Sequence, residues 1–290
     1  MTGRRAWRFA LAAIGVALAG TSATGLAAQP NALRNDAGAV APIDPYPGAA
    51  AAYVVAVDGR LHWARNPDQP RPPASLAKLL TAVVLLDDPQ WDDAARIEVS
   101  AAAAAIEGSQ LGLRRGEALR AEDALTALLV RSANDACLAL AEHFAGSIGN
   151  FVERMNTRAA ALGMSRSHFG HPCGLDAPGQ QSTARDLLRV AGVALGQPAI
   201  AARVGLARAE IATLGGRRLA FVNGNALVGR VDGVIGMKSG FTTRAGKCVI
   251  AVAQRGDHRV WLVMLGAEER WWTASGMIES AFAPFRPASP

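Results

Sequence analysis

The stretch Pro73-Ala74-Ser75-Leu76-Ala77-Lys78-Leu79-Leu80 stands where a proline-rich loop gives way to an apolar run. Proline cannot continue a helix backwards, and a serine at such a junction is typical of a helix start. If a helix begins here, Ser75 and Lys78 share one face, so we expect the lysine amine beside the serine hydroxyl. A serine needs a base to become a nucleophile, and a lysine can be that base only if burial or a nearby cation lowers its pKa.

Lysine is scarce in this chain. Lys78, Lys238 and Lys247 are the only three among 30 basic residues, and the other 27 are arginine. Arginine keeps its proton, whereas lysine can lose it, so a lysine retained among so many arginines is a candidate for amine chemistry. A serine three residues before a lysine is expected only about 0.13 times by chance. On this pair alone, a helix-start serine with an exposed surface lysine remains the alternative.

The N-terminus has the pattern of a secretory signal peptide over residues 1–28. Arginines precede an apolar run of 11 residues at 9–19, which is too short for a membrane span, and small residues follow. We therefore expect an exported protein, periplasmic or otherwise extracytoplasmic and soluble after cleavage, with an uncleaved anchor as the alternative. Residues 29–48 are rich in proline, alanine and asparagine and lack periodicity, which predicts a flexible linker.

Charge and cysteine content narrow the choice of partners. The net charge of +6 falls to about +3 without the predicted signal, and no basic cluster carries interleaved aromatic residues, so we expect no nucleic-acid partner. The three cysteines are far apart, and the five histidines form no H-E-x-x-H, so we expect no metal or other cofactor. Cys137 and Cys248 lie in apolar runs and are interpreted as buried thiols. Cys173 lies in a loop, and a bridge from it to either partner stays open.

Strand patterns lie at both ends of the chain, with helices between them. Asp58-Gly59 separates two β-rich runs and predicts a hairpin. The remaining predicted strands are at 96–99, 210–214, 217–222, 234–238, 248–254 and 260–265, and the main predicted helices are at 121–130, 135–144, 148–162, 182–195 and 268–282. We therefore expect an α+β fold, in which the N-terminal hairpin joins the C-terminal strands in one antiparallel sheet flanked by helices, beside an all-helical lobe.

Two further motifs carry chemistry. Ser132-Ala133-Asn134 falls between two predicted helices, at a corner where polar side chains can point into a cleft. Lys238-Ser239-Gly240 ends a predicted strand, and a lysine followed by a hydroxyl residue and glycine is expected only about 0.03 times by chance. Glycine permits close approach to an edge strand, and the lysine with the hydroxyl suits an anionic group such as a carboxylate.

The three motifs in this order resemble those of the penicillin-recognising serine hydrolases. The text around them, at 74–82, 131–136, 182–187 and 238–248, is similar to that of the low-molecular-mass D-alanyl-D-alanine carboxypeptidases, penicillin-binding proteins of peptidase family S11. The resemblance covers residues 50–282 and implies a β-lactamase/DD-peptidase-like fold with the active site between sheet and lobe. It implies one catalytic domain at 49–290, without the C-terminal β domain or membrane anchor of larger members, which leaves membrane association open.

The resemblance also implies roles for the motif residues. Ser75 would attack the carbonyl between the two terminal D-alanines of a peptidoglycan stem peptide, and Lys78 would take its proton. Ser132 would relay protons to the leaving amine, and Asn134 would hold Lys78 and the substrate. The backbone N–H groups of Ser75 and Phe241 would form the oxyanion hole. The residues expected to bind substrate are Lys238, Ser239, Gly240, Phe241 and Thr242. β-Lactams would acylate Ser75 as covalent inhibitors.

The sequence departs from the family in two places and leaves rival activities. Ser239 stands where threonine is commoner, and Cys173 where histidine is expected. A DD-endopeptidase that cleaves peptidoglycan crosslinks would use the same residues. A β-lactamase is less favoured, because none of the ten glutamates has an asparagine four residues later. A Ser-His-Asp hydrolase is disfavoured, because this sequence contains no G-x-S-x-G motif. A non-catalytic peptidoglycan-binding protein is a further alternative, and the intact motifs argue against it because such a protein would not need them.

Overall fold

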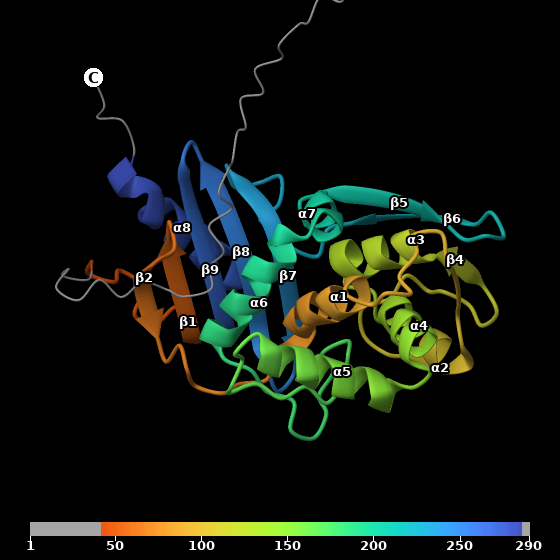
Figure 1. The fold of residues 1–290 in the computed structure, drawn as a ribbon. Coiled ribbons are helices and arrows are strands. Elements are labelled where there is room, and N and C mark those ends of the chain that lie inside the picture. The colour runs from red at the N-terminus through yellow and green to blue at the C-terminus, as the bar shows by residue number, and fades with distance from the viewer. Residues whose placement is uncertain (1–41, 286–290) are drawn as a thin grey trace, which may run out of the picture.

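The computed structural model describes residues 42–285 and contains one five-stranded sheet of order β2-β1-β9-β8-β7 (Figure 1). All its pairings are antiparallel, and β1 pairs with β9 so that Ala50 lies opposite Ala267. The prediction that the N-terminal hairpin joins the C-terminal strands is therefore confirmed. The strands are β1 (Ala50–Val57), β2 (Arg60–Arg65), β7 (Val234–Thr242), β8 (Gly246–Arg255) and β9 (His258–Ala267).

Both faces of this sheet are covered by helices. Alternate residues of a strand point to opposite faces, so Val54 joins the core that includes α6 (Ala184–Gly196), while Val55 joins the core built with α8 (Arg270–Phe282). α8 packs on β8 and β9, and α6 packs on β1, β8 and β9. The sheet is thus a buried layer, which fixes β7 as a rigid edge beside the rest of the molecule.

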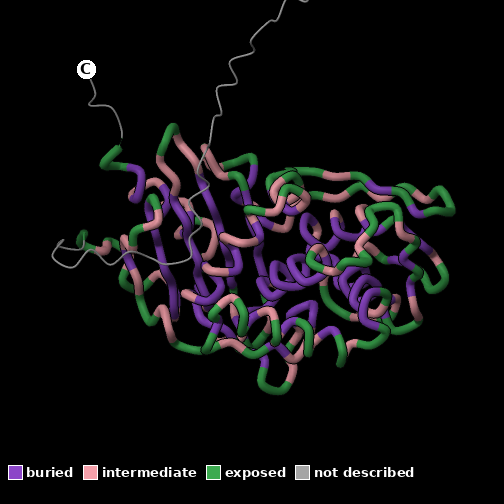
Figure 2. Tube along the Cα trace, in the orientation of Figure 1, coloured by how far each residue is buried: buried purple, intermediate pink, exposed green. Residues whose placement is uncertain are grey.

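The helical lobe lies beside β7 and is built around α1 (Lys78–Leu86), whose residues are buried except for the last (Figures 1 and 2). The lobe's other helices are α2 (Ala101–Ala105), α3 (Ala121–Thr126), α4 (Asn134–Ala145), α5 (Ile148–Ala161) and α7 (Pro198–Val204). Two short ribbons complete the described chain: β3 (Arg96–Glu98) with β4 (Ala118–Arg120), and β5 (Arg208–Ala212) with β6 (Arg218–Val222). The predicted helical middle of the chain is confirmed.

The predicted signal peptide at 1–28 and most of the predicted linker at 29–48 lie outside the described residues. The end of that linker segment makes tertiary contacts. Tyr46 bonds through its hydroxyl with Ser280 on α8 at 3.1 Å, and Asp44 accepts a hydrogen bond from the hydroxyl of Tyr53 on β1. Within residues 42–285 no single helix has the length and apolar composition to cross a membrane. Only when α6 and α7, which are bent by 103°, are counted as one segment are this length and composition reached.

Candidate active site

Ser75 lies in one turn of 3-10 helix, η1 (Ala74–Ala77), which leads directly into α1. The predicted helix is present, but α1 itself starts at Lys78, and neither helix start is capped by a side chain. A capping serine would engage its hydroxyl with a backbone N–H. The Ser75 hydroxyl instead lies 3.0 Å from the amine of Lys78, as the three-residue spacing predicts.

Lys78 is completely buried, and its amine has three oxygen neighbours. Nζ lies 3.0 Å from Ser75 Oγ, 2.7 Å from Asn134 Oδ1 and 2.6 Å from the carbonyl oxygen of Cys173. Burial is the main cause that lowers the pKa of Lys78 well below its ordinary value, and the charge of Lys238 lowers that pKa further, while the Asp135 carboxylate opposes both. The amine is therefore set to be neutral where a solvated lysine would be charged.

A neutral amine has two N–H bonds and one lone pair, and its three neighbours decide where each points. The amide oxygen of Asn134 and the carbonyl oxygen of Cys173 can only accept, so they take the two N–H bonds. The Asn134 amide is oriented by its own nitrogen, which donates to the Glu107 carbonyl at 2.6 Å. The lone pair then faces Ser75 Oγ, so that Lys78 is placed to receive the serine proton.

Ser132 and Asn134 stand at the corner where two helical segments meet. The first ends in a π-helical turn (Ala127–Arg131), and Ser132 then adopts a left-handed conformation with φ 65° before α4 starts at Asn134. The backbone N–H of Asn134 donates to the backbone carbonyl of Ser109 at 2.7 Å. The Ser132 hydroxyl is buried and has no hydrogen-bond partner among residues 42–285. That hydroxyl is free for an incoming group.

The third motif lies on β7, at the edge of the sheet. Lys238 is buried, and burial, followed by the charge of Arg270, lowers its pKa to about 7. Its Nζ donates to the carbonyl of Ser239 at 3.0 Å, and the Ser239 hydroxyl donates to the Gly224 carbonyl at 2.7 Å. Beyond them, the side chain of Phe241 is 64% exposed. The Thr242 hydroxyl donates to the Asp176 carboxylate at 2.9 Å and is not among the hydrogen-bond partners of Lys78.

Gly240 allows β7 to touch the serine turn. A Cβ atom on Gly240 would lie 2.7 Å from the backbone nitrogen of Ser75 and 2.9 Å from Cβ of Ala74, so no larger residue fits without moving one backbone. Gly174 also lies against this turn, where a Cβ atom would clash with the Ala74 carbonyl oxygen. The Ser75 N–H is thereby fixed beside the open edge of β7, between the sheet and the lobe.

Arg270, at the first residue of α8, is a site residue that the motifs do not reveal. Its Nη1 donates to the carbonyls of Gly240 at 2.6 Å and Cys248 at 3.0 Å. The C=O and N–H of a trans peptide point in opposite directions, so the N–H of Phe241, in the peptide that follows Gly240, points away from Arg270. One arginine among 27 carries no pattern in the sequence that would mark it.

A disulfide joins Cys137 on α4 to Cys173, with 5.9 Å between their Cα atoms. The interpretation of Cys137 as a buried thiol is therefore wrong, although Cys248 is indeed buried and free. The reason is tertiary: the loop before α6 folds back over the lobe and buries Cys173 beside α4. The disulfide lies next to Lys78, because the Cys173 carbonyl is one of the two acceptors of the amine's N–H bonds.

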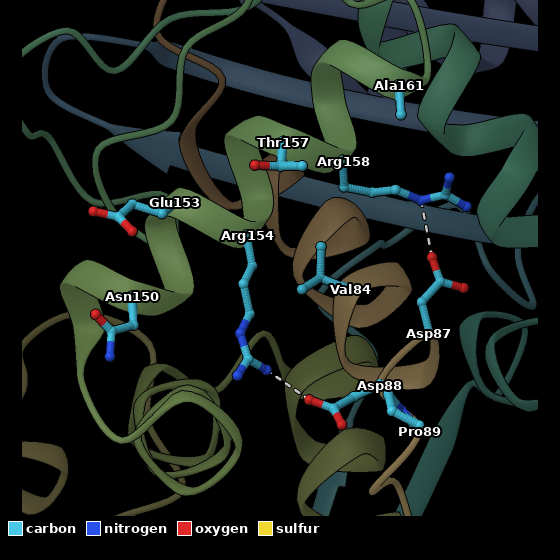
Figure 3. A pocket seen from close by; sticks show the side chains of 10 residues that line it. All are labelled: Val84, Asp87, Asp88, Pro89, Asn150, Glu153, Arg154, Thr157, Arg158 and Ala161. Atoms are coloured by element: carbon cyan, nitrogen blue, oxygen red, sulfur yellow. Dashed lines mark hydrogen bonds and ion pairs between the residues drawn. The ribbon is translucent and has the colours of Figure 1, made fainter.

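A groove of about 620 Å³ lies elsewhere, between the C-terminal end of α1 and α5 (Figure 3). Four of its charged side chains form ion pairs: Arg154 pairs with Asp88 at 2.6 Å and Arg158 with Asp87 at 2.9 Å. None of the predicted site residues lines it. This groove is not where the motifs meet.

The comparisons with known proteins agree with the geometry. The Peptidase_S11 family model, described as D-alanyl-D-alanine carboxypeptidase, matches residues 41–269. The D-alanyl-D-alanine carboxypeptidase DacF of Bacillus subtilis is 30% identical over 78% of this chain, which spans only 60% of DacF. A D-alanyl-D-alanine endopeptidase of Escherichia coli is 31% identical over 82% of this chain and 77% of its own. The crystal structure of a D-alanyl-D-alanine carboxypeptidase from Mycobacterium tuberculosis superposes with a TM-score of 0.77 and 31% identity, covering 85% of this chain and 95% of that one.

Proposed function

The chain belongs to peptidase family S11, the D-alanyl-D-alanine carboxypeptidases. We propose that it removes the terminal D-alanine from peptidoglycan stem peptides through an acyl-enzyme on Ser75. The single observation that carries the proposal is the hydrogen-bond set of Lys78. A buried amine with a lowered pKa lies 3.0 Å from the hydroxyl of Ser75, and two obligate acceptors hold its N–H bonds.

Acylation starts with the neutral amine of Lys78, which takes the proton as Ser75 Oγ attacks the carbonyl carbon of the penultimate D-alanine. The carbonyl oxygen becomes an oxyanion beside the N–H groups of Ser75 and Phe241. Arg270 supports this second donor, because it binds the carbonyl of the same peptide unit. Each such donor typically contributes about 100- to 1000-fold to the rate.

The leaving amine needs a proton, and Ser132 can relay it. The Ser132 hydroxyl, which no described residue bonds, accepts the proton from the Lys78 ammonium and donates its own to the nitrogen of the terminal D-alanine as the C–N bond breaks. Lys78 is then neutral again and can take a proton from water, which attacks the ester and regenerates Ser75. Asn134 keeps the amine oriented through both half-reactions.

The terminal carboxylate of the substrate suits the β7 edge. Lys238 supplies a cation whose pKa of about 7 would rise on binding an anion, and Ser239 supplies a hydroxyl. Gly240 brings the β7 backbone beside Ser75, and Phe241 follows it on the same strand. Thr242 can join this set only by giving up its hydrogen bond to Asp176. A β-lactam carries a carboxylate and an acyl bond in the same arrangement and would acylate Ser75 as an inhibitor.

The test is the intact mass of the protein after incubation with benzylpenicillin, for the wild type and for Ser75→Ala, followed by assay of D-alanine release from a stem pentapeptide. We expect a long-lived adduct on the wild type alone, with D-alanine released only by the wild type. Rapid hydrolysis of the drug without an adduct would instead indicate a β-lactamase. If the folded wild type gives neither an adduct nor hydrolysis, the proposed mechanism is wrong and a non-catalytic peptidoglycan-binding protein becomes the favoured interpretation.

A DD-endopeptidase activity is the second candidate, because the Escherichia coli relative carries that name. An endopeptidase would use the same nucleophile and base, so the Lys78 geometry fits either activity. Digestion of purified crosslinked muropeptide dimers beside pentapeptide monomers separates the two: the endopeptidase converts dimers to monomers and leaves pentapeptides intact.

The proposed place of action is outside the cytoplasm. Peptidoglycan is assembled there, and residues 1–28 have the sequence pattern of an export signal. The Cys137–Cys173 disulfide supports the proposal, since such bonds form and persist in oxidising compartments. N-terminal sequencing of the exported protein would test the predicted cleavage after residue 28.

A further inference from the structure

The disulfide connects the two segments that supply the acceptors of Lys78. Asn134 lies in the first turn of α4, three residues before Cys137, and the other acceptor is the carbonyl of Cys173 itself. Both cysteines have no exposed surface, and they are 36 residues apart in the chain. A covalent bond therefore links the two segments whose oxygens accept the N–H bonds of Lys78.

We propose that the Cys137–Cys173 disulfide is a positioning element for the catalytic base. It holds the Cys173 carbonyl oxygen against the Lys78 amine, and without it the lone pair of Lys78 no longer points steadily at Ser75. The inference rests on the proposed function, because it assigns the disulfide a part in acylation of Ser75.

Among the described residues, Lys78 is the one hydrogen-bond donor to the Cys173 carbonyl, whereas other non-covalent contacts hold the atoms around that carbonyl. The Thr81 hydroxyl donates to the Pro172 carbonyl at 2.6 Å, and His171 Nδ1 accepts from the Cys173 N–H at 3.1 Å. Gly174 lies against the serine turn. These contacts keep the loop on the lobe when the disulfide is absent, so the protein folds. The Cys173 peptide unit gains freedom, and a misplacement of 1 Å in such a group can cost about 100-fold in rate.

The pH profile of acylation reports this role specifically. The ionisable groups that act on Lys78 or are acted on by it are Lys238 on β7, Asp135 on α4 and His171 in the loop. Burial is the largest cause of the lowered Lys78 pKa, so a looser loop that admits water raises that pKa. The acid limb of the acylation rate then moves to higher pH. A disulfide that only stabilised the fold would leave the profile of the folded protein unchanged.

The experiment compares wild type, Cys137→Ala and Cys248→Ala. Cys137→Ala opens the disulfide without altering residue 173, and Cys248→Ala removes the buried free thiol as a matched control. The second-order rate constant for acylation by a fluorescent penicillin is measured from pH 5 to 9, with thermal unfolding to show that each protein is folded. We expect a fall of about 10- to 100-fold and an upward shift of the acid limb for Cys137→Ala, and wild-type behaviour for Cys248→Ala.

A wild-type rate and acid limb in folded Cys137→Ala overturn this inference and leave the proposed function intact. The same holds if non-reducing peptide mapping finds free thiols at Cys137 and Cys173 in fully active wild type. A wild type that no penicillin acylates overturns the proposed function, and this inference with it. If Cys137→Ala does not fold, wild type reduced by a phosphine, with both thiols verified by alkylation and mass, replaces it under the same criteria.

Discussion

Arg270 Nη1 donates a hydrogen bond to the carbonyl oxygen of Gly240 over 2.6 Å, and so joins the start of α8 to the edge of the sheet that faces Ser75. The same arginine is the second cause, after burial, of the low pKa of Lys238. One side chain behind β7 thus influences both an N–H donor and a cation at the proposed site.

Replacing Arg270 by methionine should slow acylation by benzylpenicillin about 10- to 100-fold, because the peptide unit before Phe241 loses its support. The matched control is Arg255→Met. Arg255 binds Glu279 on α8 at 2.9 Å, so this change also removes an anchor of α8, but away from Gly240. Equal rates for the two variants would show that Arg270 acts only by fixing the helix.

Gly240→Ala should lower the acylation rate more than 100-fold in a protein that still folds. The added methyl group would lie 2.7 Å from the Ser75 nitrogen, so β7 or the serine turn must move and the oxyanion donors separate. Gly196→Ala is the control, since a Cβ atom there meets nothing within 4 Å. Stopped-flow acylation measures the effect, and a Gly240→Ala rate within threefold of wild type would contradict the inferred close contact.

The pH dependence of kcat/KM for a stem peptide should be bell-shaped. The rate rises as Lys78 loses its proton, and it falls above a pH of about 7 as Lys238 loses the charge that binds the substrate carboxylate. Lys238→Arg keeps the cation at all these pH values and should remove the falling limb. An unchanged falling limb in this variant would assign it to another group.

Asp135→Asn should move the acid limb of acylation to lower pH. The Asp135 carboxylate favours the protonated form of Lys78, so neutralising it lowers the pKa of the amine further. Asp186→Asn serves as the control, because Asp186 is also a buried carboxylate but is not among the groups that shift Lys78. Both variants should unfold at lower temperature than wild type, and only Asp135→Asn should alter the pH profile.

The sequence predicted those parts of the molecule that depend on local spacing. The interval between Ser75 and Lys78 placed both on one turn, and the β-rich runs at the two ends of the chain predicted one sheet. Contacts between distant backbone groups left no such signal. The Cys173 carbonyl is an acceptor that any residue could supply, and no sequence motif distinguishes Arg270 from the other arginines. The pairing of Cys137 also escaped, because disulfide connectivity depends on how a loop folds back and not on spacing.

The pairing of β1 with β9 has a consequence for biosynthesis. Ala50 and Ala267 are neighbours in the sheet, so β1 can pair with β9 only after the chain has been synthesised to residue 267. Pairings of such long sequence separation form slowly. A nascent or prematurely terminated chain that ends before β9 therefore has Ser75 and Lys78 without the completed sheet, and the proposed hydrolytic activity begins only once β9 has been synthesised.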